Sequence, residues 1–386
     1  MYDDLFLRYK AISLYRAVAA ELSPLAELLI ADSSARRAEL CADVFRRVAE
    51  SGCETTGEWI NKLVMGDDNF FSRSAARGER ISERVKSQVM TELTTFKQLS
   101  LLRPEDFADD AVRDFLPRFS CGGFSFTFDK LVKFYFASGC GALAYGNIFT
   151  YKSGIFSPAH SDAVRLSDLV NYAEEKAEIV RNTENFLNGL PAFHTLLYGD
   201  RGTGKSTTVR ALAYEYRDRL KVIELAKNEL CRLPKLQNEL YGLKQKYILF
   251  IDDLGFDEAD GGAEDFKVAL EGSLDAPSGN VLIYCTSNRR HLFKETDKTE
   301  MRNRGDEIQA ELALFDRFGL VVTYISPSKD EFIDILKQIV RSRGIKWRDE
   351  YAVLAELAAL KKGGRTPRAA KQIADVIETT YAERRE

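Results

Sequence analysis

The sequence predicts a three-layer α/β protein in which helices cover both faces of a parallel sheet. Two observations carry this prediction. Short apolar segments alternate with helical segments through the middle of the chain, as in parallel strands joined by helical crossovers. A glycine-rich loop containing a lysine directly follows the first of these segments. The expected strands are 195–198, 220–225, 247–251, 281–286 and 320–325.

Length and composition predict more than one folding unit. The chain has 386 residues and 45% hydrophobic content, whereas single cores stop growing at roughly 250–300 residues. We expect a mostly helical N-terminal domain over 1–156, which would bind a partner or client, an α/β domain over 157–325 and a helical domain over 326–386. Within the first domain, the alternation of Phe124, Phe126 and Phe128 favours a short strand.

Charge and cysteine content narrow the class of protein. The net charge of −4 gives no overall basic footprint for nucleic acid, although local basic runs occur at 289–291 and 361–362. The sequence contains no run of about 18 apolar residues, and it begins with acidic residues where a signal peptide would be basic. The 6 cysteines are scattered without a CxxC pair. We therefore expect a cytoplasmic protein with reduced thiols and no membrane association.

The strongest motif is the GxxxxGKS loop at 199–206. Glycines let consecutive backbone N–H groups converge on a triphosphate, and the following helix adds the positive end of its dipole. Lys205 is expected to reach the β- and γ-phosphates of ATP, and the Ser206 hydroxyl to bind Mg²⁺. A structural turn is the alternative, but a strand precedes the loop and a helix follows it. The expected nucleotide-binding residues here are Gly199, Asp200, Arg201, Gly202, Thr203, Gly204, Lys205, Ser206 and Thr207.

Two carboxylates end the expected strand 247–251. At the carboxyl edge of a parallel sheet they would lie beside the phosphate site. Asp252 is suited to hold Mg²⁺, and Asp253 to polarise an attacking water. Many ATPases carry Glu in the position of Asp253, and Asp is one methylene shorter. Hydrolysis is therefore expected to be slow, or to be assisted by Glu258.

Three further residues are candidates for sensing or stabilising the phosphates. Asn288 follows the strand 281–286 and is suited to bind the γ-phosphate or the water, although Thr-Ser-Asn is also an ordinary strand end. Arg317 precedes the last strand, from where an arginine can reach a neighbouring subunit's nucleotide. Arg368 follows the helix start formed by Thr366 and Pro367. Both arginines could instead be solvated surface groups.

The same motifs, taken in order, resemble those of AAA+ ATPases, and more narrowly the bacterial AAA+ family of unknown function numbered 815. The resemblance covers about 145–381. The strings that carry it are Gly199–Ser206, Ile251-Asp252-Asp253-Leu254, Glu271-Gly272-Ser273-Leu274, Thr286-Ser287-Asn288-Arg289-Arg290-His291-Leu292, Asp316-Arg317-Phe318-Gly319-Leu320 and Gly364-Arg365-Thr366-Pro367-Arg368.

The resemblance implies a role for each matched residue. Lys205 and Ser206 would be the Walker A residues, and Asp252 and Asp253 the Walker B pair. Asn288 would be the strand sensor and Arg317 the arginine finger. The implied lid sensor is Arg368, with Arg365 as the alternative, and the implied adenine contacts are Leu169 and Val170. Asn171-Tyr172 departs from the glycine that many members carry at this place.

Two functions from different classes follow from these expectations. The first is an ATPase that assembles into an oligomer, with a hexameric ring as one arrangement, and couples hydrolysis to work on a protein or nucleic-acid client. The second is a nucleotide-gated binding module with little hydrolysis. An ATP-dependent kinase would need a substrate pocket, for which the sequence offers no candidate residues.

Overall fold

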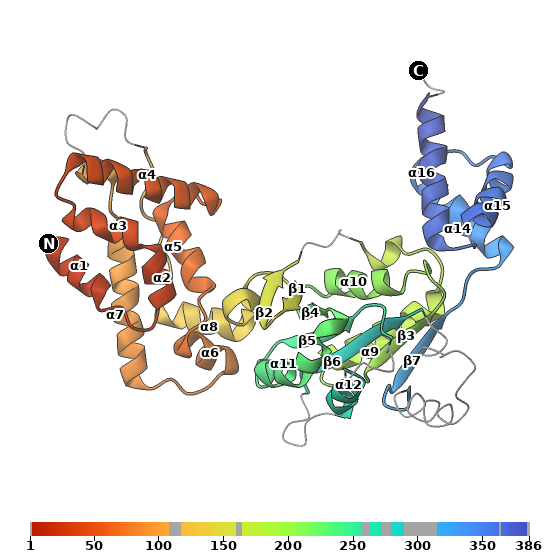
Figure 1. Cartoon of the computed structure of the whole chain (residues 1–386), viewed down its shortest axis with the longest axis horizontal. Coiled ribbons are helices and arrows are strands. Elements are labelled where there is room, and N and C mark those ends of the chain that lie inside the picture. The colour runs from red at the N-terminus through yellow and green to blue at the C-terminus, as the bar shows by residue number, and fades with distance from the viewer. Residues whose placement is uncertain are drawn as a thin grey trace, which may run out of the picture. The chain divides into compact units, whose positions relative to one another are not determined.

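The computed structural model describes residues 2–107, 117–159, 164–255, 262–271, 279–288, 315–362 and 364–383 (Figure 1). Residue contacts divide the chain into two compact units. The first comprises Met1–Tyr145 with Leu243–Gln245, and the second comprises Gly146–Gly242 with Lys246–Glu386.

The N-terminal unit is mostly helical, as predicted. Serine, threonine or asparagine side chains cap five of its helices by accepting a backbone N–H of the first turn. Its helices are α1 Tyr2–Lys10, α2 Arg16–Glu21, α3 Ser23–Glu27, α4 Ser34–Glu50, α5 Thr56–Met65, α6 Phe70–Arg77, α7 Glu83–Leu99 and α8 Phe128–Ser138, with 3₁₀ turns η1 Leu28–Ile30, η2 Pro104–Phe107 and η3 Gly141–Ala144.

A buried carboxylate and a cluster of aromatic rings hold this unit together. Glu92 on α7 is 2% exposed, and its oxygens accept the backbone N–H groups of Ser13, Leu14 and Tyr15 at 2.9–3.1 Å. These bonds fix the segment between α1 and α2 against α7. The Tyr15 ring packs edge-on against Phe96, at 5.8 Å between ring centroids. Glu92 therefore fixes a turn whose backbone donors would otherwise be left unpaired.

The strand expected around Phe124, Phe126 and Phe128 is not formed. Residues 121–127 have no ladder partner, and α8 begins at Phe128 because Thr127 caps it. The aromatic side chains instead pack locally, with Phe126 near Phe134 and Phe128 stacked on Phe71. Alternation alone does not make a strand when no neighbouring strand supplies hydrogen bonds.

The second unit is built on a seven-stranded sheet in the order β2-β1-β4-β5-β6-β3-β7. All neighbouring pairs except β1–β2 are parallel. The five predicted strands are confirmed, with ends that move by at most one residue. The strands are β1 Ile148–Lys152, β2 Ile155–Pro158, β3 Thr195–Gly199, β4 Leu220–Leu225, β5 Lys246–Ile251, β6 Val281–Ser287 and β7 Leu320–Tyr324.

Strands β1 and β2 were not predicted. They form a hairpin whose two turn residues, Ser153 and Gly154, have φ of 53° and 85°, the left-handed geometry of a tight hairpin turn. β1 also pairs in parallel with β4, so the hairpin extends the sheet. The domain boundary expected after residue 156 falls inside β2, whereas the contacts divide the chain at Tyr145 and Gly146.

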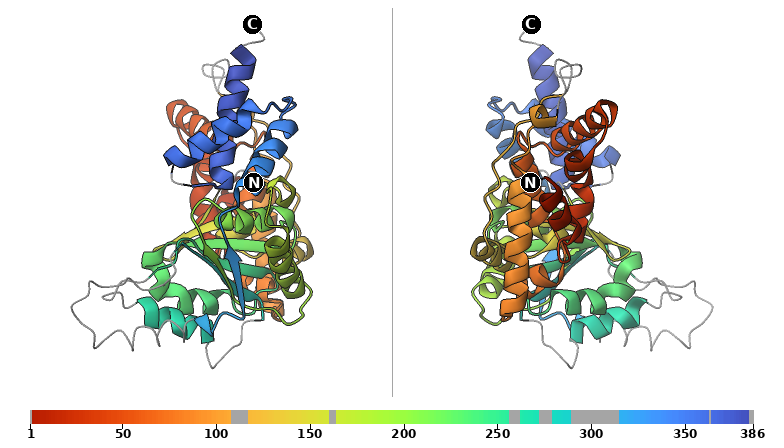
Figure 2. Two further views of the ribbon diagram at one scale, coloured as in Figure 1. Left: turned by 90° about the vertical axis from the view of Figure 1, so that its right-hand side faces the viewer. Right: turned by 90° about the vertical axis from the view of Figure 1, so that its left-hand side faces the viewer.

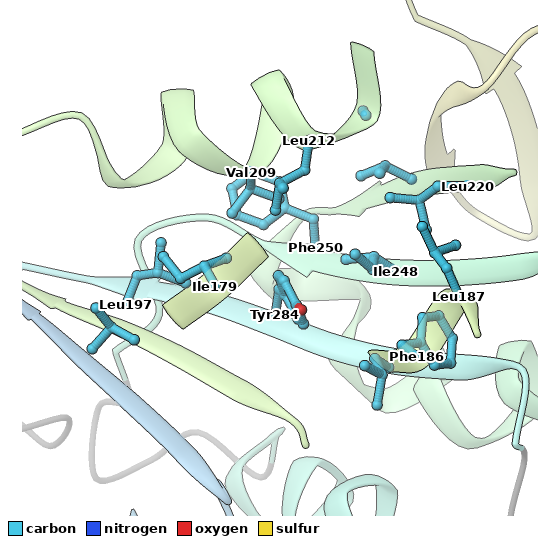
Figure 3. Close-up of a cluster of buried hydrophobic side chains, with 14 of the residues drawn as sticks. Ile179, Phe186, Leu187, Leu197, Val209, Leu212, Leu220, Ile248, Phe250 and Tyr284 are labelled. Atoms are coloured by element: carbon cyan, nitrogen blue, oxygen red, sulfur yellow. The ribbon is translucent and has the colours of Figure 1, made fainter. Parts of the chain in front are cut away.

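Helices cover both faces of the sheet, as the apolar strands require. Alternate strand residues, including Ile248, Phe250 and Tyr284, pack beneath Val209 and Leu212 of α10 (Figure 3). The intervening residues are buried as well, which places cover on the other face. Helices α11 and α12 lie on the side opposite α10 (Figures 1 and 2). The connecting elements are η4 Leu166–Asp168, α9 Ala173–Leu187, α10 Lys205–Glu215, η5 Lys227–Arg232, α11 Leu233–Leu240 and α12 Gly262–Glu271.

Three C-terminal helices form a smaller core, as predicted for the region after 326. They are α14 Lys329–Ser342, α15 Glu350–Lys362 and α16 Pro367–Glu383. The capping box of Ser328 and Glu331 is confirmed at the start of α14. Thr366 accepts the N–H of Ala369 at 3.1 Å, so the expected start of α16 is confirmed too. Phe332, Leu336 and Ile373 lie at the centre of this core.

Within the described ranges, no helix combines the length and the apolar character that crossing a bilayer would need.

The histidine that precedes β3 predicts how the stability of the fold depends on pH. His194 Nδ1 accepts the N–H of Ile283 at 3.0 Å, and burial lowers the pKa of the imidazole from 6.5 to about 4. The unfolded chain therefore takes up a proton before the folded chain does as pH falls. We expect the unfolding free energy to fall by about 2–3 kcal/mol between pH 6.5 and pH 4 on account of this group.

Urea denaturation followed by circular dichroism checks this expectation. His194→Gln keeps an acceptor for Ile283 but cannot titrate, so its unfolding free energy should decline less steeply over the same pH range. Parallel pH profiles for the two proteins would contradict the assignment.

Candidate functional site

The loop between β3 and α10 has the backbone geometry that phosphate binding needs. Gly199, Gly202 and Gly204 have φ of 129°, 76° and 101°, values that side-chain-bearing residues rarely adopt. A Cβ at Gly199 would lie 2.0 Å from the carbonyl oxygen of Tyr324, so the close approach of β7 requires glycine here. The loop thus curls against the sheet and leads into the N-terminus of α10, where backbone N–H groups are available to an anion.

Lys205 lies at the centre of the loop and is only 5% exposed. Its Nζ donates to Gly199 O at 2.9 Å, Asp200 O at 2.6 Å and Asn288 Oδ1 at 2.8 Å. Burial lowers the pKa of the ammonium to about 8, although nearby carboxylates, Asp252 among them, favour the charged form. All three protons of the ammonium are donated to neutral oxygens. Phosphate oxygens are charged and would therefore replace these acceptors.

Asp252 joins three elements of the fold. Its Oδ1 accepts the hydroxyl of Ser206 on α10 at 2.5 Å and the hydroxyl of Thr286 on β6 at 2.6 Å. Its other oxygen, Oδ2, lies 3.6 Å from Nη2 of Arg210. A hydroxyl and a carboxylate in contact are the hard oxygen donors that Mg²⁺ takes. The Ser206–Asp252 pair therefore fits the metal that was predicted for it.

Asp253 is held in a strained conformation. Its φ is 54°, in the left-handed region, which costs a residue other than glycine about 1 kcal/mol or more. Two hydrogen bonds hold it there: its N–H donates to Thr286 Oγ1 at 2.9 Å, and its Oδ1 accepts from Asn288 Nδ2 at 2.9 Å. Asn288 thus bridges Lys205 and Asp253, which brings three predicted residues into one network.

Thr286 and Arg210 are residues of this network that the sequence reasoning did not assign. The Thr286 hydroxyl donates to the carboxylate of Asp252 and accepts the backbone N–H of Asp253, and its position at the end of a strand was the available signal. Arg210 lies four residues after Ser206 and hence on the same face of α10. Its Nη2 donates to Glu224 Oε1 at 3.2 Å, in addition to its contact with Asp252.

The segment predicted to flank the adenine contacts the C-terminal helices. Val170 packs against their core, and the carbonyl of Leu169 accepts a hydrogen bond from Lys176. Asn171 and Tyr172 have φ of 74° and 58°, so the two residues that stand where many members carry glycine adopt the conformation that glycine favours. Whether Leu169 and Val170 contact an adenine stays a prediction.

The three candidate arginines occupy distinct places. Arg365 forms two hydrogen bonds with Glu356, at 3.0 and 2.8 Å. The backbone N–H of Arg368 donates to Gly202 O at 3.3 Å, so the first turn of α16 lies against the phosphate loop. Arg317 lies in the turn before β7 and is partly buried. Their roles stay predictions, and Glu258 and the basic run 289–291 lie outside the described residues.

The fold and the site define a P-loop protein of the AAA+ type. The core strands run in the order β4-β5-β6-β3-β7, the loop follows β3, and the carboxylates follow β5. Residues 144–381 match the family described as "Protein of unknown function (DUF815)". This match covers more than half of the chain, and the protein belongs to this family.

Two curated proteins are similar in sequence to part of this chain. The replication factor C large subunit of Sulfolobus acidocaldarius is 34% identical over 110 residues, which are 25% of this chain and 24% of the relative. The replication factor C large subunit of Pyrococcus horikoshii is 28% identical over 215 residues, which are 52% of this chain and 42% of the relative. The chain therefore spans less than half the length of these relatives.

Solved structures of related fold have lower identity. The Thermotoga maritima RuvB Holliday junction branch migration motor is 18% identical with a TM-score of 0.39, covering 55% of this chain and 63% of its own. The Aeropyrum pernix Orc1 protein in complex with DNA is 17% identical with a TM-score of 0.41, covering 56% of this chain and 62% of its own.

The lowered pKa of Lys205 predicts the pH dependence of phosphate binding. Because its pKa is about 8, the lysine is charged below this pH and loses its charge above it. We expect the affinity for a fluorescent ATP analogue in EDTA to fall as pH rises above 8, by up to about tenfold per pH unit.

Equilibrium titrations between pH 7.5 and 9.5 measure this dependence. Lys205→Arg keeps its charge throughout, so its affinity should change little over the range. A wild-type affinity that stays constant up to pH 9.5 would show that Lys205 is not the titrating group.

Proposed function

We propose that the protein hydrolyses ATP and uses the energy for conformational work on a client, as an oligomer. One observation carries the proposal. Lys205, Ser206, Asp252, Asp253 and Asn288 come from three separate segments of the sequence and lie in one hydrogen-bonded network around the phosphate loop, joined through Thr286. Positioned cations, hydroxyls and carboxylates of this kind are the parts that phosphoryl transfer to water needs.

Each residue has a specific task in this proposal. Lys205 would exchange its three neutral acceptors for phosphate oxygens, and Ser206 with Asp252 would hold Mg²⁺. When bound, the metal offsets the negative charge that gathers on the phosphates. Asp253 would orient and polarise the attacking water, with Asn288 holding its carboxylate in place.

Contacts between the phosphate loop and the C-terminal helices support coupling to motion. The carboxylate of Asp200 accepts the N–H of Ser326 at 2.9 Å, at the segment that leads from β7 into α14. The hydroxyl of Tyr172 donates to the neighbouring carbonyl of Ile325 at 2.8 Å. With the contact between Arg368 of α16 and Gly202, three bonds tie the helices, or the segment that leads into them, to the nucleotide site. A change in the loop on hydrolysis would therefore act on the helices directly.

The client class follows only from the relatives. The curated matches are replication factor C large subunits, which favours nucleic acid or a protein bound to it. The net charge of −4 offers no overall attraction for a polyanion. We therefore keep a protein client beside a nucleic-acid client, with the N-terminal helices as the element that recruits it.

The same geometry also supports a second candidate, a nucleotide-gated switch with little turnover. Asp253 is one methylene shorter than Glu, and its carboxylate already accepts a hydrogen bond from Asn288. A carboxylate that stays bound to Asn288 would be less available to a water molecule. ATP would then hold one conformation of the C-terminal helices without being hydrolysed rapidly.

Mixing variants tests whether Arg317 acts on a neighbouring subunit. Arg317→Ala should reduce ATP turnover roughly 100-fold or more while ATP binding is retained, because the arginine would stabilise transition-state charge. Lys205→Ala should be inactive through loss of the phosphate contact. A mixture of the two should recover part of the turnover, because intact sites of one chain would meet intact arginines of the other.

The matched control replaces Lys205→Ala in the mixture by the double variant Lys205→Ala/Arg317→Ala, which should give no recovery. Normal turnover by Arg317→Ala alone would contradict the oligomeric ATPase.

A further inference from the structure

The contact between α10 and the sheet changes from apolar to charged at its end near the phosphate loop. Phe250 of β5 packs against α10 among Val209 and Leu212 (Figure 3). Glu224 of β4 is the register partner of Phe250, and Asp252 follows Phe250 by two positions. Side chains two apart on a strand share a face, so both carboxylates lie on the face that α10 covers. Arg210 of α10 is the cation between them.

One guanidinium nitrogen spans the two carboxylates. Arg210 Nη2 lies 3.2 and 3.4 Å from the two oxygens of Glu224, within hydrogen-bond distance. The same atom lies 3.6 Å from Asp252 Oδ2, within reach of an ion pair. Oδ1 of Asp252 is already occupied by two hydroxyl donors, so Arg210 contacts the one oxygen that they leave.

We propose that Arg210 and Glu224 are positioning residues that set how strongly the Ser206–Asp252 pair takes Mg²⁺. This inference rests on the proposed nucleotide site. Arg210 orients Asp252 through Oδ2, and its positive charge opposes an incoming cation. Glu224 holds the guanidinium and offsets that charge. The affinity for the metal is therefore set by the balance between the two side chains.

The charges predict opposite effects for the two residues. With both present, Arg210, Glu224 and Asp252 carry a net charge of about −1 before the metal binds. Without Glu224 the net charge is about zero, and the guanidinium acts on the metal unopposed. Without Arg210 the two carboxylates give about −2, which attracts the metal more strongly. A pair that only stabilised the fold would not produce opposite signs.

The test is a Mg²⁺ titration of the full chain with a fluorescent, non-hydrolysable ATP analogue. Glu224→Gln should raise the half-saturating Mg²⁺ concentration roughly three- to tenfold, and Arg210→Gln should lower it by a similar factor. The double variant should return to within about twofold of wild type, since both charges are removed together. Affinity for the analogue in EDTA should be the same in all four proteins.

Two further variants separate charge from folding. Arg217→Gln removes a charge near the far end of α10, where Arg217 lies over the Tyr214 ring, and should leave the Mg²⁺ response unchanged. Arg210→Lys keeps the charge and should stay within about twofold of wild type, even where Arg210→Gln fails to fold.

Two outcomes would overturn the inference but leave the proposed function standing. In the first, the half-saturating Mg²⁺ concentration moves in the same direction for Arg210→Gln and Glu224→Gln. In the second, it stays within twofold of wild type for both. A wild-type chain that binds the analogue without any response to Mg²⁺ would overturn the inference and the assigned metal site. A wild-type chain that binds no analogue at all would contradict the proposed function and the inference with it.

Discussion

The bond network around the Asp252 carboxylate is the interaction on which the site depends. One oxygen of this carboxylate accepts the hydroxyls of Ser206 and Thr286, which belong to a helix and to a neighbouring strand. These bonds therefore fix the start of α10, the end of β5 and the end of β6 relative to one another. The residue next to Asp252, Asp253, continues the network. Asn288 donates to its carboxylate and accepts a hydrogen bond from Lys205. Loss of the Asp252 carboxylate would leave the hydroxyl protons of Ser206 and Thr286 without this acceptor.

The site carries local strain that the sheet offsets. Asp253 has a left-handed backbone, whereas the three glycines of the phosphate loop adopt positive φ without such a cost. The strands beneath are buried on both faces, so their positions are fixed by packing over the whole sheet. A rigid sheet edge can hold an unfavourable loop conformation in place, whereas a mobile one would relax it. The strain is thus concentrated where the phosphates would bind.

Much of the fold was predictable because its signals are local. Strands such as β5 and β6 are continuous apolar runs, since a parallel strand covered on both faces needs no polar side. The phosphate loop follows a fixed spacing, and α14 and α16 begin with ordinary capping residues. Asp252, Asp253 and Asn288 could be placed at the sheet edge because each ends such a run.

The remaining features depend on contacts that the sequence does not display. β1 and β2 are short and partly exposed, so they lack the apolar run that identifies the central strands. The roles of Thr286 and Arg210 depend on which strands are neighbours, and no spacing along the chain gives this. The alternation at 124–128 satisfied a local pattern, but no strand lies beside it to supply hydrogen bonds.

ATP turnover measured against protein concentration tests the central claim most directly, with wild type beside Lys205→Ala. An ATPase that completes its site on assembly predicts turnover that rises more steeply than linearly with concentration and is lost in the variant. ATP binding with negligible wild-type turnover at every concentration would contradict that claim and leave the nucleotide-gated switch.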